Sequence, residues 1–89
     1  PLSMIKYEKV SVTVELKVDT FGNENFLSLE WEDGRVYHID KTFSIRMSPP
    51  QHVGAVLTKR YDVLIEGQEK ILYRETATNR WFVEKPLIN

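Results

Sequence analysis

The 89-residue sequence contains no cysteine, which excludes a disulfide framework, thiolate-bound zinc and thiol catalysis. It has no apolar run near the roughly 20 residues that cross a bilayer as a helix, and no signal peptide is visible. The four glycines are isolated, so a glycine-rich phosphate-binding loop is also excluded. We therefore expect no membrane association, and no residue pattern calls for a cofactor.

The sequence also lacks an excess of charge of either sign, because 12 basic and 13 acidic side chains leave a net charge of −1. This balance argues against a protein that holds nucleic acid by bulk charge. The length suits one globular domain over residues 1–89. Within it, we expect residues 1–4 to be a disordered or cloning-derived tail, before a native start at Met4.

What the sequence does have is period-two alternation of apolar and polar residues, the pattern of half-buried strands. It is clearest over residues 10–18, where valines and a leucine alternate with polar side chains. Further strands are predicted between turn signals, over residues 26–31, 36–47, 57–66, 71–75 and 81–85. We expect turns at Gly67-Gln68 and Thr78-Asn79, and Pro86 to end the last strand because proline cannot donate to a ladder.

The connection over residues 48–56 has Ser48 and Gln51 flanking two prolines, a pattern that favours at most one short helical turn. In the later strands, the better core candidates are Val63, Ile65, Ile71 and Tyr73. Trp81 and Phe82 are adjacent, so in a strand they point to opposite faces and one of them lies outside the main core.

The strongest turn signal is Asp33-Gly34, and the register around it is decided by burial. A two-residue turn makes both faces of the hairpin half polar. A three-residue loop, with Gly34 left-handed at a bulge, puts Leu29 opposite Tyr37 and gathers the apolar side chains on one face. We predict this loop, a positive φ at Gly34, and an outward face that carries Glu30, His38 and Asp40.

That outward face holds one group of side chains with the residue types of a catalytic or metal site. His38 and Asp40 lie two residues apart on one side of their strand, and Glu30 is expected close by. A carboxylate beside an imidazole raises its basicity and forms a general base or a metal site. The alternative, favoured because His-x-Asp is common by chance, is a solvated polar face with one surface histidine.

A second candidate site combines cations with aromatic rings. The predicted binding residues are Arg60, Arg74, Arg80 and Trp81, which occur among further aromatic and basic residues. Small antiparallel barrels bind single strands or peptides with such sets. A partly covered sheet face and a homodimer contact are the alternatives, and exposed edge strands also invite strand addition by a partner.

Two stretches carry a resemblance to a known family: residues 27–40 (LSLEWEDGRVYHID) and 79–84 (NRWFVE). Together they resemble small uncharacterised bacterial proteins, chiefly of Gram-positive species, that are classed as domains of unknown function. A similar order occurs in an actinobacterial family associated with translesion-polymerase gene neighbourhoods. The resemblance implies a cytoplasmic bacterial protein and brings no catalytic residues. It also implies a glycine-rich connection after the third strand, where this chain has SPPQHVG.

These observations predict an all-β domain, a meander of about six short strands that forms an SH3-like or partly open β-barrel. The leading hypothesis for its function is a non-enzymatic module that binds a protein partner or itself, as a homodimer. The second is a nucleic-acid-associated accessory factor related to DNA repair. The third is a small metal-dependent enzyme that uses His38 and Asp40.

Overall fold

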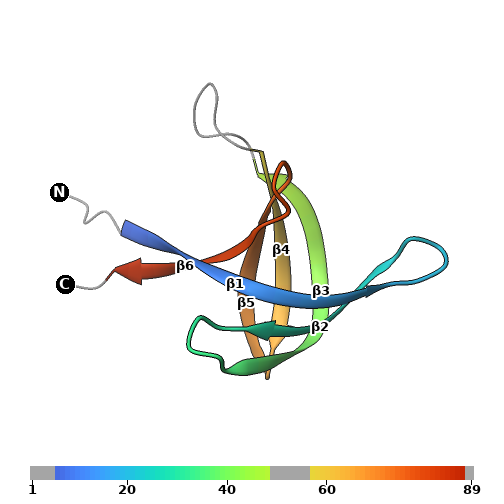
Figure 1. Ribbon diagram of the computed structural model, residues 1–89, viewed down its shortest axis with the longest axis horizontal. Coiled ribbons are helices and arrows are strands. Elements are labelled where there is room, and N and C mark those ends of the chain that lie inside the picture. Colours follow the sequence, from blue (N-terminus) through green and yellow to red (C-terminus); the bar gives the residue numbers. More distant parts are fainter. Residues whose placement is uncertain (1–5, 49–56, 88–89) are drawn as a thin grey trace.

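The computed structural model describes residues 6–48 and 57–87, in which the chain forms six antiparallel strands and no helix. The strands are β1 (Lys6–Val18), β2 (Glu24–Glu30), β3 (Val36–Ser48), β4 (Thr58–Ile65), β5 (Gln68–Glu75) and β6 (Trp81–Leu87). Each pairs with the next, and β1 pairs with β6, so the meander closes into a barrel (Figure 1). The all-β barrel prediction is confirmed. The predicted tail over 1–4 and helical turn after Ser48 lie outside the described residues.

The two long strands close the barrel, because each passes from one neighbour to another along its length. The first half of β1 pairs with β6 and the second half with β2. In the same way β3 pairs first with β2 and then with β4. Irregular register at Asp40 and Phe43 bends β3, as β-bulges do, and Figure 1 shows this strand as a strong curve.

The hairpin between β2 and β3 has the predicted register. Leu29 pairs with Tyr37, the N–H of Gly34 donates to the carbonyl of Trp31 at 2.9 Å, and Gly34 has φ 90°. The three-residue loop is therefore confirmed. Leu29 is buried at 3% exposure, while His38 on the opposite face is exposed.

The core lies inside the barrel and draws on every strand. Its most buried side chains are Tyr61, Val63 and Leu72, all at 0% exposure. The rings of Phe26, Tyr61 and Trp81 contact one another, with centroids 5.0 to 5.4 Å apart. Phe82 lies on the outer face, stacked on Tyr73 at 5.2 Å, so the prediction that Trp81 and Phe82 divide between the two faces is confirmed.

Two expectations for β5 are wrong. The turn before it is Glu66-Gly67 and not Gly67-Gln68. Glu66 has φ 47° and Gly67 has φ 83°, and Gln68 already pairs with Ile65. A two-residue hairpin turn of this kind needs positive φ at both central positions. Pairing from that turn sets Leu72 opposite Tyr61, so Leu72 is in the core.

The consequence is that Ile71 and Tyr73 face outward, and the prediction that they belong to the core is wrong. The three consecutive residues Ile71, Leu72 and Tyr73 are all hydrophobic, so no alternation in the sequence distinguishes the two faces of the strand here. The last strand also differs from its expected bounds, because β6 continues through Pro86, which pairs with Tyr7 of β1.

Candidate functional site

The predicted cation and aromatic residues do not form one surface. Arg60 lies on the outer face of β4, where its Nε donates to Asp62 at 3.1 Å. Arg74 lies on the inner face of β5, where it donates to Glu24 at 3.3 Å. The two arginines therefore sit on opposite faces of the barrel wall, and each already has a carboxylate partner.

The remaining two members of the set are separated in the same way. Trp81 packs inside the barrel against Phe26 and Tyr61, with the guanidinium carbon of Arg74 5.6 Å from its ring centroid. The ring is therefore partly buried and is engaged with core side chains. Arg80 is exposed in the turn between β5 and β6.

The predicted metal constellation is not formed. Among the described residues, no three His, Asp or Glu side chains come close enough to hold a metal ion. The hairpin pairs Glu30 with Val36 and not with His38. The bulge at Asp40 redirects that side chain, whose Oδ2 accepts the N–H of Gly67 at 3.1 Å. His38 and Asp40 are both exposed, and Asp40 anchors the turn between β4 and β5.

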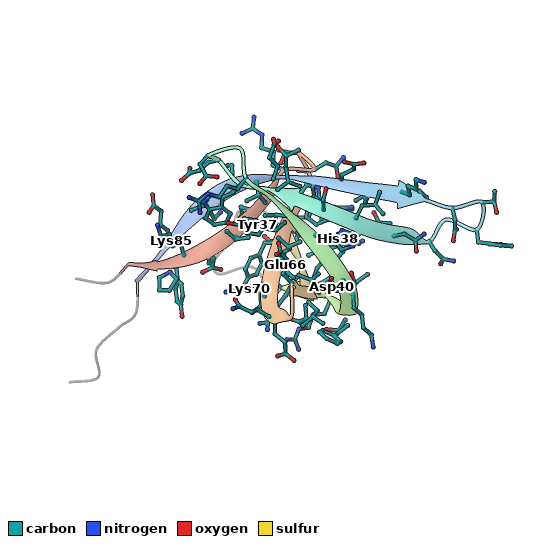
Figure 2. All side chains as sticks on the ribbon, turned by 90° about the horizontal axis from the view of Figure 1, so that it is seen from below. Tyr37, His38, Asp40, Glu66, Lys70 and Lys85 are labelled. Carbon is teal, nitrogen blue, oxygen red and sulfur yellow. The ribbon has the colours of Figure 1, made fainter. Side chains whose placement is uncertain are left out.

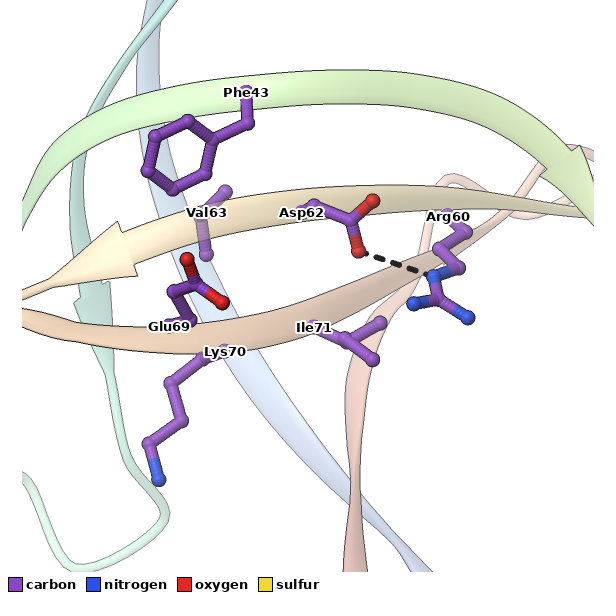
Figure 3. Close-up of a pocket in the computed structure, with 7 residues that line it drawn as sticks. All are labelled: Phe43, Arg60, Asp62, Val63, Glu69, Lys70 and Ile71. Atoms are coloured by element: carbon purple, nitrogen blue, oxygen red, sulfur yellow. Dashed lines mark hydrogen bonds and ion pairs between the residues drawn. The ribbon is translucent and has the colours of Figure 1, made fainter.

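A shallow hollow of about 430 Å³ lies on the outer face, between Phe43 of β3 and the strands β4 and β5 (Figure 3). Asp62 at its side accepts hydrogen bonds from Ser44 at 2.6 Å and Arg60 at 3.1 Å, and forms an ion pair with Arg46 at 3.5 Å. The hydrogen bond from Ser44, followed by Arg60, lowers the pKa of Asp62. Asp62 therefore holds Ser44, Arg46 and Arg60 together on the outer face.

The larger feature is a gap in the pairing between β5 and β6. Both strands are paired on their other edges, β5 with β4 and β6 with β1, along their whole lengths. Toward each other they pair only next to their connecting turn, through Tyr73 with Phe82 and Arg74 with Trp81. Figure 1 shows β6 leaving with β1 toward the chain ends, away from β5. The ring of strands is therefore locally open along this seam.

The seam leaves backbone groups of β5 without a partner strand among the described residues. The N–H of Glu75 donates to the carbonyl of Arg80, so Glu75 directs its backbone groups toward β6. Along an antiparallel strand, the N–H and carbonyl groups of successive residues point alternately to the two neighbouring strands. Tyr73 therefore also faces β6 and is paired there. Ile71 and Glu69 face the same way, in the part of β5 that β6 does not reach.

The facing edge of β6 is partly blocked. By the same alternation, Glu84 and Pro86 direct their backbone groups toward β5, while Val83 and Lys85 face β1. Proline has no N–H and is confined in sheets to unpaired edge positions. Pro86 thus fits here without breaking the ladder to β1. On the seam, the β6 edge lacks one N–H donor, whereas the β5 edge has an N–H and a carbonyl at each position.

A groove of about 930 Å³ follows this seam and reaches the barrel interior. Its inner wall consists of apolar and aromatic side chains that pack against the core, namely Leu29, Trp31, Tyr37, Ile65 and Val83. Lys70 and Lys85 line it from β5 and β6, and both are labelled in Figure 2. Sequence reasoning missed this groove. The signal that bears on it is Pro86, inside a segment that otherwise continues as a strand.

Comparison with known proteins finds no matching family model, no matching curated protein and no matching solved structure. A search of the described ranges for a helix with the length and apolar character of a membrane span finds none. The candidate site therefore has to be interpreted from its own geometry.

Proposed function

We propose that this chain is a non-enzymatic binding module that takes up an extended segment of a protein partner as an extra strand beside β5. The observation that carries the proposal is the open seam, in which the backbone groups of Ile71 and Glu69 face away from β4 and pair with no strand of the described chain, next to a 930 Å³ groove. In strand addition, main-chain hydrogen bonds supply affinity and pockets for alternate side chains supply specificity. The seam provides both elements side by side.

The nucleic-acid hypothesis has less support. Its key ring, Trp81, packs among Phe26 and Tyr61, and Arg60 and Arg74 are engaged with acidic side chains on opposite faces. The SH3-like assignment, the homodimer and a bacterial cytoplasmic setting remain predictions from the sequence and form part of this proposal.

The test begins with selection of short linear peptides from a displayed library against the whole chain. We expect a selected peptide to slow hydrogen exchange at the amides of Ile71 and Glu69, because an added strand pairs with them. Methylating the backbone nitrogens of alternate peptide residues gives a matched pair of probes. One set removes the N–H groups that face β5 and abolishes binding, and the other set binds as before.

Two results contradict the proposal. One is a library that yields no binding peptide. The other is a peptide that binds while the Ile71 and Glu69 amides exchange as in the free protein.

A further inference from the structure

The groove carries two lysines on its inward side, one from each strand of the seam. Lys70 lies two residues before the buried Leu72 in β5, and Lys85 lies two residues after Val83 in β6, so each shares the inward face of its neighbour. Both side chains are exposed and line the groove. Neither takes part in an ion pair with another described residue. In Figure 3 the Lys70 side chain points away from the outer hollow.

The outward side of the same seam has the opposite charge. Glu69 of β5 and Glu84 of β6 alternate with the lysines, so they lie on the outer face. Glu84 also interacts electrostatically with the Tyr73 hydroxyl, which places that carboxylate near the paired end of the seam. An inserted strand therefore meets two ammonium groups on one face and two carboxylates on the other.

We infer that the segment bound at the seam is acidic on its inward face, with a carboxylate side chain beside Lys70 and Lys85 and an apolar side chain two residues away against the groove wall. This inference rests on the proposed function and adds the chemistry of the partner. Residues of a strand alternate between faces, so inward positions recur every second residue. The inward residue opposite Gln68, two positions from the one opposite Lys70, is then the apolar one, because Gln68 pairs with Ile65 and both line the groove.

Charge pairing gives the inference its specificity. Opposite charges placed directly across neighbouring strands are favourable, and like charges are unfavourable by a similar amount. Glu69 and Glu84 disfavour acidic side chains at outward positions and favour basic or neutral ones there. The partner expected is thus an extended peptide with alternating character, and not one that is uniformly acidic.

The experiment compares three forms of the whole chain: wild type, the double variant Lys70→Glu/Lys85→Glu, and the matched control Lys17→Glu. Lys17 is an exposed residue of β1 that pairs with Asn25 and does not line the groove. Each form is used to select peptides from the same displayed library, and the selected peptides are measured by fluorescence anisotropy. Amide spectra of the free variants check that each is folded.

We expect wild type and Lys17→Glu to select peptides with an acidic residue at one inward position and an apolar residue two positions away. The double variant is expected to select basic residues there, and to bind the wild-type peptide about tenfold more weakly, from two reversed cross-strand pairs. If all three forms select the same peptides, the inference on partner charge is wrong while strand addition stands. If no form selects a peptide, the proposed function itself is overturned, and the inference with it.

Discussion

The substitution Tyr61→Phe is expected to stabilise the protein, although it alters a fully buried core residue. Tyr61 is 0% exposed, and its hydroxyl has no hydrogen-bond partner among the described residues. Its ring contacts Phe26 and Trp81 at centroid distances of 5.2 and 5.0 Å. Phenylalanine keeps these ring contacts and removes only the unpaired hydroxyl.

The magnitude follows from the cost of burying an unpaired polar group. An unsatisfied buried donor or acceptor costs about 1–3 kcal/mol. We take the lower end because the Tyr61 hydroxyl still interacts with the nearby charge of Arg74. The expected gain is about 1 kcal/mol in the free energy of unfolding, which for a domain of this size raises Tm by about 4–8 °C.

The assay is chemical and thermal denaturation, with Tyr73→Phe as the matched control. The Tyr73 hydroxyl lies on the outer face and interacts with Glu84, so its removal is expected to cost about 0.5–1.5 kcal/mol. Opposite signs for two Tyr→Phe changes separate the effect of burial from the effect of the residue type. Loss of stability in Tyr61→Phe by 1 kcal/mol or more, on the scale of a lost hydrogen bond, refutes the reasoning.

Alkaline pH gives the same substitution a second readout. Burial raises the pKa of Tyr61 above its ordinary value of 10.0. Stability that depends on a neutral Tyr61 is therefore complete below that value and is lost as the pH rises through the raised pKa. Because phenylalanine does not ionise, the advantage of Tyr61→Phe should grow above about pH 10. A constant difference across this range contradicts the assignment.

Three further predictions use denaturation as their measurement. Leu72→Ala should cost about 2–5 kcal/mol and Ile71→Ala less than half as much, because only Leu72 is in the core; equal losses contradict the register of β5. Glu66→Asn should stabilise by about 1 kcal/mol, since Glu66 has φ 47° and asparagine tolerates that conformation better; no gain contradicts the turn assignment. Asp62→Asn should destabilise at neutral pH, with the gap to wild type closing as the pH falls below 3.8 and through the lowered pKa of Asp62, because the stabilisation is complete above 3.8 and is lost when the folded carboxylate is protonated; a gap that persists in strong acid is contrary to its hydrogen bonds.

The fold was largely predictable because local patterns agreed with burial. The hairpin at Gly34 had one register that gathered Leu29 and Tyr37 on one face, and that register is present. The division of Trp81 and Phe82 followed from adjacency alone. Where both neighbours of a residue are also apolar, as around Leu72, alternation carries no information and the wrong face was chosen.

The candidate site was less predictable, because distance along the sequence does not give position on a closed barrel. Arg60 and Arg74 occur near aromatic residues in the chain, yet the pairing of β4 with β5 places them on opposite faces. Asp40 shares a strand face with His38, but a bulge turns it to the backbone of Gly67. Each outcome depends on a partner strand that the local pattern does not specify.

By itself, the sequence determined the class of fold, the number of strands and the Gly34 turn, since alternation and turn residues act through local conformation and burial. Only the tertiary structure decided that β5 and β6 part beyond Phe82, because β6 follows β1 while β5 follows β4. That divergence leaves the edge of β5 unpaired and brings Lys70 and Lys85 to the two sides of one groove. A strand edge is open or closed according to how whole strands curve, and curvature is a property of the assembled sheet.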